Sequence, residues 1–239
     1  MSPLGAPGKL KGLDPQARAR FELIDDYLRS EEPGLALELD TEARSARIIG
    51  KLAVDIGAGI LRQYKVEFRF HDLDPFSVPD AWDAGRHFRP DGDRHVEDHR
   101  ERGWRWCLWL PHSPEVDFSL PTGIKDFIDH VRGFIFKQLV YEERKRQGHP
   151  HPWPGDEWGH GNEGHVEWLE ERLGDLEAES IQRLRPFLTT SRLATKKRCP
   201  CGSGRKAGGC HKPVVDEIRE AMIPDLAESL GLLIARRRN

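Results

Sequence analysis

The sequence predicts an α+β fold, in which an antiparallel sheet with flanking helices precedes a small cysteine-rich module and a C-terminal helix. Three observations indicate this order. Apolar residues alternate with polar ones between residues 35 and 70, which is typical of half-buried strands. Helical periodicity flanks this region on both sides. Three of the four cysteines of the 239-residue chain lie within residues 199–210.

The first predicted helix follows a tail rich in Gly, Pro and Lys, residues 1–12, which we expect to be mobile. Asp14 is a favourable N-cap, and Pro15 suits the first helical position. Apolar side chains then recur at helical spacing from Phe21 to Leu28. The Pro33-Gly34 pair predicts the end of the helix.

Three strands are expected next, over residues 35–39, 46–56 and 64–70. The last is the clearest, because its alternate residues are aromatic or β-branched. Residues 71–103 contain many Pro, Asp and His residues, which exclude long regular elements. Residues 104–110 (WRWCLWL) are apolar and aromatic, so we expect them to be buried.

The helices of the second half are predicted from periodicity and caps. Thr122 can cap a long helix whose apolar side runs from Ile124 to Leu139. Residues 149–165 are loop by composition, and residues 166–187 are predicted to be helical. A final helix over residues 214–235 should bend at Pro224.

These elements suggest five segments. No apolar run approaches the roughly 20 residues that span a bilayer, and residues 1–12 hold no signal-peptide core, so we expect a cytoplasmic protein. The segments are a tail (1–12), a main domain with a His- and Trp-rich extension (13–178), a basic connector (179–197), a metal module (198–213) and a C-terminal helix (214–239).

The cysteine-rich module predicts a site for one zinc ion. Cys199 and Cys201 are two residues apart, and Gly202 and Gly204 give the backbone the freedom to turn there. Cys210 and His211 would complete a tetrahedron of three thiolates and one imidazole. In a cytosolic chain this pattern favours metal binding over disulfides. Four protein ligands leave no position for water, so the zinc should be structural.

The segment CPCGSGRKAGGCH, residues 199–211, closely resembles the SEC-C motif. The Cys-Pro-Cys-Gly-Ser-Gly start, the basic pair Arg205-Lys206 and the final Cys-His match that motif. It forms the C-terminal zinc tail of the SecA translocation ATPase and is appended to many bacterial proteins. The resemblance covers about fifteen residues and implies a structural module that docks partners.

A basic stretch surrounds the module. The net charge of −3 argues against a chain that binds polyanions over its whole surface. Residues 180–215, however, contain no acid and nine basic residues. This stretch could meet nucleic acid, ribosome or an acidic protein face, or it could be a solubilising surface around the metal. The basic residues are Arg183, Arg185, Arg192, Lys196, Lys197, Arg198, Arg205, Lys206 and Lys212.

Residues 14–146 resemble the ubiquitin-conjugating enzyme fold in the order and spacing of their elements. The strand VEFRF (66–70) precedes prolines at 75 and 79. Arg94-His95-Val96 occupies the place of the family's His-Pro-Asn turn. Gly103 precedes Trp106-Cys107-Leu108, as a glycine precedes the family's Cys-Leu pair. Residues 120–139 resemble the helix that follows. The segment HPWPGDEWGHG is similar to an extension of divergent bacterial conjugating-enzyme-like proteins.

The resemblance implies a transferase that carries a ubiquitin-like modifier on Cys107 as a thioester, after receiving it from an activating enzyme. His95 would assist it, and His160 would act as acid or base in a wall of the cleft. The Asn of the family's turn is absent, so His95 or His99 would have to act in its place during transfer to an amine.

Other interpretations stay open. Cys107 could be a core cysteine, since free cysteines are often buried. His151, His160 and His165 could bind a second metal with Asp156 or Glu157, or simply stabilise their loop through hydrogen bonds. The whole chain could be a non-enzymatic adaptor that recruits a protein client or the ribosome through the basic module, or a zinc hydrolase at the histidine-rich loop.

Overall fold

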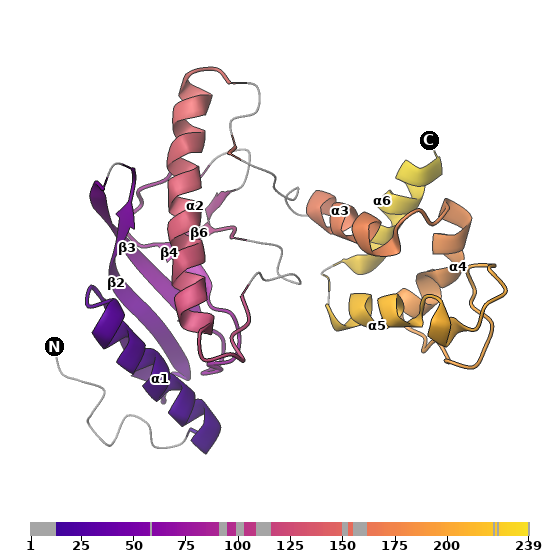
Figure 1. Cartoon of the computed structure of the whole chain (residues 1–239), viewed down its shortest axis with the longest axis horizontal. Helices are drawn as coiled ribbons and strands as arrows, with labels where there is room; N and C mark the ends of the chain where they lie inside the picture. Colours follow the sequence, from indigo (N-terminus) through magenta and orange to yellow (C-terminus); the bar gives the residue numbers. More distant parts are fainter. Residues whose placement is uncertain are drawn as a thin grey trace. The chain divides into compact units, whose positions relative to one another are not determined.

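A computed structural model describes residues 13–57, 59–90, 95–98, 103–108, 116–149, 153–154, 162–221, 223 and 225–238. Several predicted features lie outside the described residues: the tail 1–12, His99, His151, His160 and the Asp156-Glu157 pair. The chain divides into an α+β unit, which ends near residue 156, and a helical unit from residue 157 onward (Figure 1).

The α+β unit is built on a six-stranded antiparallel sheet with the strand order β1-β2-β3-β4-β6-β5. Antiparallel pairing was expected, and each strand pairs with its neighbour in the sheet in that sense. The strands are β1 (Leu35–Asp40), β2 (Ser45–Asp55), β3 (Leu61–Phe70), β4 (Asp80–Asp83), β5 (Val96–Asp98) and β6 (Trp104–Trp106). The strands β4 and β5 are short, in agreement with the composition of residues 71–103, and β6 directly after them is also short.

Two helices cover one face of this sheet: α1 (Pro15–Glu31) and α2 (Gly123–Arg146). The alternation in β3 places Tyr64, Val66, Phe68 and Phe70 in the core. Phe70 meets Phe21 of α1 edge to face at 5.6 Å, and Phe68 meets Phe127 of α2 at 5.0 Å. These aromatic contacts pack both helices against the sheet.

The helix ends test the predicted caps. Asp14 caps α1, and its carboxylate accepts the N–H groups of Gln16 at 2.9 Å and Ala17 at 3.1 Å. Thr122 precedes α2 as predicted, but its side chain makes no cap hydrogen bond because its backbone is already helical. The inner side predicted for α2 is confirmed from Ile124 to Gln138, while Leu139 is only partly buried.

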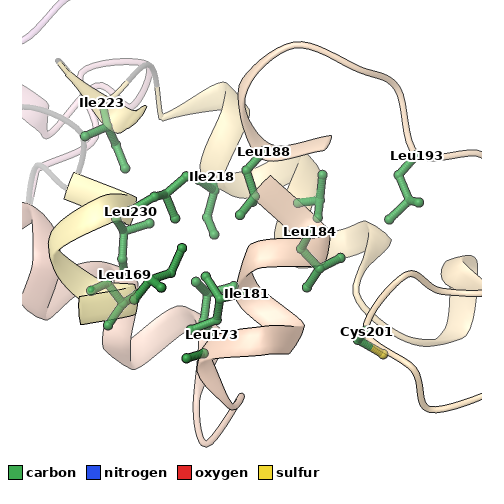
Figure 2. Close-up of a cluster of buried hydrophobic side chains, with 14 of the residues drawn as sticks. Leu169, Leu173, Ile181, Leu184, Leu188, Leu193, Cys201, Ile218, Ile223 and Leu230 are labelled. Carbon is green, nitrogen blue, oxygen red and sulfur yellow. The ribbon is translucent and has the colours of Figure 1, made fainter. Parts of the chain in front are cut away.

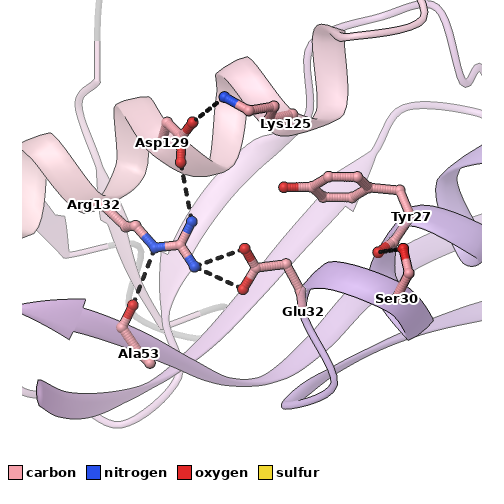
Figure 3. Close-up of polar contacts among 7 residues, drawn as sticks. All are labelled: Tyr27, Ser30, Glu32, Ala53, Lys125, Asp129 and Arg132. Atoms are coloured by element: carbon pink, nitrogen blue, oxygen red, sulfur yellow. Dashed lines mark hydrogen bonds and ion pairs between the residues drawn. The ribbon is translucent and has the colours of Figure 1, made fainter.

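A partly buried ion pair joins the two helices to the sheet (Figure 3). Arg132 on α2 donates to both carboxylate oxygens of Glu32, at 2.6 and 2.7 Å. Glu32 is the C-cap residue of α1. The same guanidinium also donates to Asp129 at 3.0 Å and to the Ala53 carbonyl of β2 at 3.1 Å. Arg132 therefore holds three elements together at one point.

The helical unit contains α3 (Asn162–Leu173), α4 (Ala178–Thr189), the short 3₁₀ helix η1 (Ala207–Gly209), α5 (Lys212–Glu220) and α6 (Leu226–Arg238). Residues 166–187 were predicted as one helix, but α3 ends at Leu173. Gly174 follows it with φ +55°, the left-handed conformation that commonly ends helices. The single helix predicted over residues 214–235 is likewise two helices, because α5 ends at Glu220 and α6 begins at Leu226. Pro224, where the sequence predicts a bend, lies outside the described residues.

The predicted segment boundaries differ from the division of the structure. Residues 179–197 were expected to be a connector, yet much of this range is α4, whose side chains at 181, 184 and 188 are buried. The chain divides near residue 156, not at residue 178. An amphipathic helix buries its apolar stripe against its neighbours, so α4 belongs to the helical unit.

Candidate metal centre and the predicted catalytic residues

The four predicted metal ligands converge in the helical unit. Cys199 and Cys201 lie on the loop that follows α4, Cys210 ends η1, and His211 is the N-cap residue of α5. Their ligand atoms all lie within 4.8 Å of one another. Among the described residues this is the one group of three or more Cys, His, Asp or Glu side chains that converges in this way. The group could hold one metal ion.

The spacing of the ligand atoms fits a tetrahedral ion. With metal–sulfur bonds of about 2.3 Å and metal–nitrogen bonds of about 2.0 Å, tetrahedral edges are about 3.8 Å between sulfurs and about 3.5 Å between sulfur and nitrogen. The sulfurs of Cys201 and Cys210 are 3.7 Å apart, and Cys199 Sγ is 3.5 Å from His211 Nδ1. Cys210 Sγ lies closer to this nitrogen, at 3.2 Å. The imidazole therefore presents Nδ1 to the centre.

A short hairpin positions the first two cysteines. Cys199 N–H donates to the Arg205 carbonyl, and Ala207 N–H donates to the Lys197 carbonyl, both at 2.8 Å. Between them Gly202 and Gly204 have φ values of +93° and +74°, which side chains with a Cβ rarely adopt. The turn predicted from these glycines is thus present.

Ser203 contacts the sulfurs of two ligands. Its hydroxyl oxygen lies 3.2 Å from Cys201 Sγ and 3.3 Å from Cys210 Sγ. Burial alone would raise the pKa of Cys201, but the Ser203 hydroxyl and N–H, together with the neighbouring thiols, lower it to about 6. Burial raises the pKa of Cys199. Because metals bind thiolates, Ser203 favours the ligand form of Cys201. The sequence analysis did not single out Ser203.

Arg183 and Ser180 anchor the metal loop, residues 190–211 between α4 and α5, to α4. The Arg183 guanidinium donates to the Pro200 carbonyl at 2.9 Å and to the Cys201 carbonyl at 2.8 Å. The Ser180 hydroxyl donates to the same Cys201 carbonyl at 2.9 Å. Sequence analysis placed Arg183 only within a basic stretch. No local pattern in the sequence indicates this role, because the carbonyls lie 17 and 18 residues further along the chain.

The metal loop is part of the hydrophobic core of the helical unit (Figure 2). Cys199, Cys201 and Ala207 belong to one buried cluster with Ile181 and Leu184 of α4. The same cluster includes side chains of α3, α5 and α6. The metal centre is therefore packed within this unit, in place of the separate module 198–213 that the sequence predicted.

Cys107, the predicted nucleophile, directly follows β6 and is partly exposed. Its N–H donates to the carbonyl of His95 at 2.9 Å, so the two residues lie side by side across the edge of the sheet. Arg105 lies two residues before it. Burial lowers the pKa of Arg105, but the hydrogen bond and charge of Glu97, and the charges of Asp80 and Cys107, raise it above its ordinary value. None of the four cysteines forms a disulfide.

The His95 side chain is in the core. It is 2% exposed, stacks on the Trp153 ring at 4.0 Å and meets Tyr141 edge to face at 4.7 Å. His165, proposed for a second metal, is also buried, in α3, and burial lowers its pKa. Its predicted partners lie outside the described residues. The structure thus brings the Cys107 and His95 backbones together but leaves the predicted role of His160 untested.

Comparisons with protein-family models, with curated proteins and with solved structures return no match for this chain. In the described part of the chain, no helix combines the length and the apolar content that crossing a membrane requires. The metal centre and the position of Cys107 therefore carry the functional argument.

Proposed function

We propose that the α+β unit is a carrier of the ubiquitin-conjugating type, which accepts a ubiquitin-like modifier as a thioester on Cys107. The observation that carries this proposal is the position of Cys107. It is the one cysteine outside the metal cluster and it is partly exposed. It directly follows β6, the neighbour of the edge strand β5, and precedes the long helix α2 in the chain. This is the order in which the resembling family holds its nucleophile.

The chemistry needs a thiol and two partners but no cofactor. The Cys107 thiolate attacks the carbonyl carbon of the thioester between modifier and activating enzyme. A new C–S bond forms, the old one breaks, and the activating enzyme's thiolate leaves. A target amine then attacks the Cys107 thioester, forms an amide, loses its proton to solvent or a nearby base, and releases the Cys107 thiolate.

The residues around Cys107 support this chemistry in two ways. Arg105, two residues before Cys107, is a nearby cation: burial lowers its pKa, but Glu97, Asp80 and, last, the charge of Cys107 raise it above its ordinary value. The hydrogen bond from Cys107 N–H to the His95 carbonyl holds the backbone of the nucleophile, and the rings of Trp153 and Tyr141 hold His95 in turn. We therefore propose a positioning role for His95 and assign the acid or base role to His160, which lies outside the described residues.

A charging assay tests the proposal. Purified chain is incubated with ATP, a ubiquitin-like protein and the activating enzyme of that protein. We expect a conjugate that reducing agent removes, that Cys107→Ala abolishes, and that becomes resistant to reducing agent in Cys107→Ser as an oxyester. Arg105→Met removes the cation near Cys107 and should charge more slowly than wild type. Its control is Arg47→Met, which removes an exposed cation elsewhere on the sheet and should charge at the wild-type rate. An uncharged wild type with its metal bound would refute the carrier function.

We propose further that the metal is zinc, one ion per chain, with a structural role. Three thiolates and one imidazole at tetrahedral spacing are typical of closed zinc sites. This agrees with the resemblance to the SEC-C motif, and it leaves no ligand position for a hydrolytic water. The closed centre supports a docking role for the surface around it. Elemental analysis of the purified chain should give about one zinc per protein, and none in Cys210→Ser.

A second candidate is a non-enzymatic adaptor built from the same two units. It is favoured by the burial of His95 and by Trp106, the neighbour of Cys107, which is 2% exposed. Labelling with a small thiol reagent separates the candidates without any partner. A carrier must react at Cys107 in the folded, metal-bound protein, so reaction there only after unfolding would exclude the carrier and favour the adaptor.

A further inference from the structure

Six cations of the metal loop form an exposed surface without neutralising acids. We define this metal-loop surface by Arg192, Lys196, Lys197, Arg198, Arg205 and Lys206, all of which are exposed. Within the described part of the chain, the side chains of these six residues make no hydrogen bond or ion pair. By contrast, Arg183, Arg185 and Arg219 each donate to backbone carbonyls of the helical unit. The six cations of the metal-loop surface therefore form no hydrogen bond or ion pair that would explain them as part of the fold.

The charges of the helical unit are separated in space. Residues 162–238 hold fourteen Lys and Arg against twelve Asp and Glu, so the unit is nearly neutral as a whole. The acids are used elsewhere: Glu217 pairs with Arg172 at 2.6 Å, and Glu170 pairs with Arg236 at 3.1 Å. None lies within residues 180–215. Separation of this kind leaves a local positive potential that the net charge conceals.

The hairpin brings like charges together. Arg198 and Lys206 are directly opposite each other across an antiparallel bridge. Like charges in opposed positions destabilise such a pair. The metal centre cannot account for this arrangement, since three thiolates around a dication leave a single negative charge. A fold that keeps this repulsion in an exposed hairpin is suited to an anionic ligand.

We propose that the metal-loop surface binds the phosphate backbone of double-stranded nucleic acid. Two observations favour a duplex over an acidic protein or a single strand. Leu193 is the one large apolar residue in this loop, and it is buried, whereas protein interfaces have apolar centres depleted of Lys. Residues 190–212 contain no Phe, Tyr or Trp on which unpaired bases could stack. Phosphates require only cations and hydrogen-bond donors.

Salt dependence gives the quantitative test. Each phosphate neutralised adds about −0.9 to the slope of log K against log salt for duplex DNA. If about five of the six cations contact phosphates, affinity should fall roughly 500-fold between 50 and 200 mM KCl. The measurement is fluorescence anisotropy of labelled 24-base-pair DNA and RNA duplexes, with the full, metal-loaded chain. The two duplexes show which nucleic acid is preferred, and binding of either one supports the proposal.

A pair of matched variants locates the site. Lys197→Gln with Arg205→Gln should reduce the magnitude of the slope by about 2 and weaken binding at least tenfold at 100 mM KCl. Both variants keep the backbone bonds of the hairpin, and metal content checks that the fold persists. Lys51→Gln with Arg62→Gln removes two exposed cations of the α+β unit and should change neither quantity.

Three results would overturn the proposal: no duplex binding at 50 mM KCl, equal losses in the two double variants, or binding of polyglutamate in preference to both duplexes. The last would identify an acidic polypeptide as the ligand. The inference is independent of the thioester proposal, because Cys107→Ala should abolish charging and leave duplex binding unchanged.

Discussion

Removal of the metal should destabilise the whole helical unit and not only the metal loop. The reason is that the loop carries part of the unit's core: Leu193 is 5% exposed and Ala207 is fully buried against α4, α5 and α6. If the loop disorders, both side chains lose their packing. The bonds from Arg183 and Ser180 to the loop carbonyls are lost as well.

The magnitude follows from these contacts. Burial of Leu193 contributes about 2 kcal/mol and that of Ala207 somewhat less, about 1 kcal/mol. The loop bonds of α4, which are partly exposed, add about 1–2 kcal/mol together. The free energy of unfolding should therefore fall by about 4 kcal/mol, out of about 5–15 kcal/mol for a typical domain. For a unit of this size the loss corresponds to a decrease in melting temperature on the order of 20 °C.

The assay combines thermal melting, followed by circular dichroism, with hydrogen exchange measured by mass spectrometry. After chelation, peptides from α4 and α5 should exchange faster, while peptides from α2 serve as the reference within the same molecule. Cys210→Ser should reproduce the effect of the chelator. Cys107→Ala also removes a thiol but should retain metal and melting temperature. If metal leaves and only residues 195–211 exchange faster, with the melting curve unchanged, the coupling argued here is incorrect.

Three further predictions concern contacts within each unit. Arg132→Met should lower the free energy of unfolding of the α+β unit by about 2 kcal/mol in urea titrations. The loss is smaller than for a fully buried pair because Arg132 is partly exposed. The control is Arg146→Met on the same helix, whose partner is solvent-exposed, and it should unfold in urea like wild type. Hydrogen bonds from Arg69, offset in part by burial, hold the pKa of Glu67 below its ordinary value of 4.5, so its stabilising effect is present above that pH and is lost as pH falls through the folded pKa. Glu67→Gln should therefore destabilise the protein at pH 7, and its difference from wild type should shrink below pH 4.5; a constant difference from pH 3 to 7 would contradict this. Arg183→Met should release metal to a competing chelator at least tenfold faster than wild type, whereas unchanged release would mean that the loop holds its shape without α4.

The sequence by itself determined the local features of this protein. The helix α1 and the strands β1 to β3 follow from periodicities within single segments, and Asp14 caps the residues beside it. The four metal ligands could be identified because all of them lie within thirteen residues, Cys199 to His211, so the turn at Gly202 and Gly204 brings them together without help from distant chain. The break after α3 also has a local signal in the sequence, Gly174. The apolar periodicity of residues 166–187 nevertheless predicted one continuous helix across it.

Only the tertiary structure decided what those features pack against. Arg183 meets carbonyls 17 and 18 residues away, Arg132 meets Glu32 at a separation of 100 residues, and Cys201 enters a core assembled from four helices. His95 lies in a stretch whose composition predicts a loop, where a histidine is expected to be exposed. In the structure its ring instead packs between those of Trp153 and Tyr141. The physical reason is common to all of these. Burial and long-range hydrogen bonding depend on which surfaces meet after the chain has folded, and neither spacing nor composition within a segment encodes that choice.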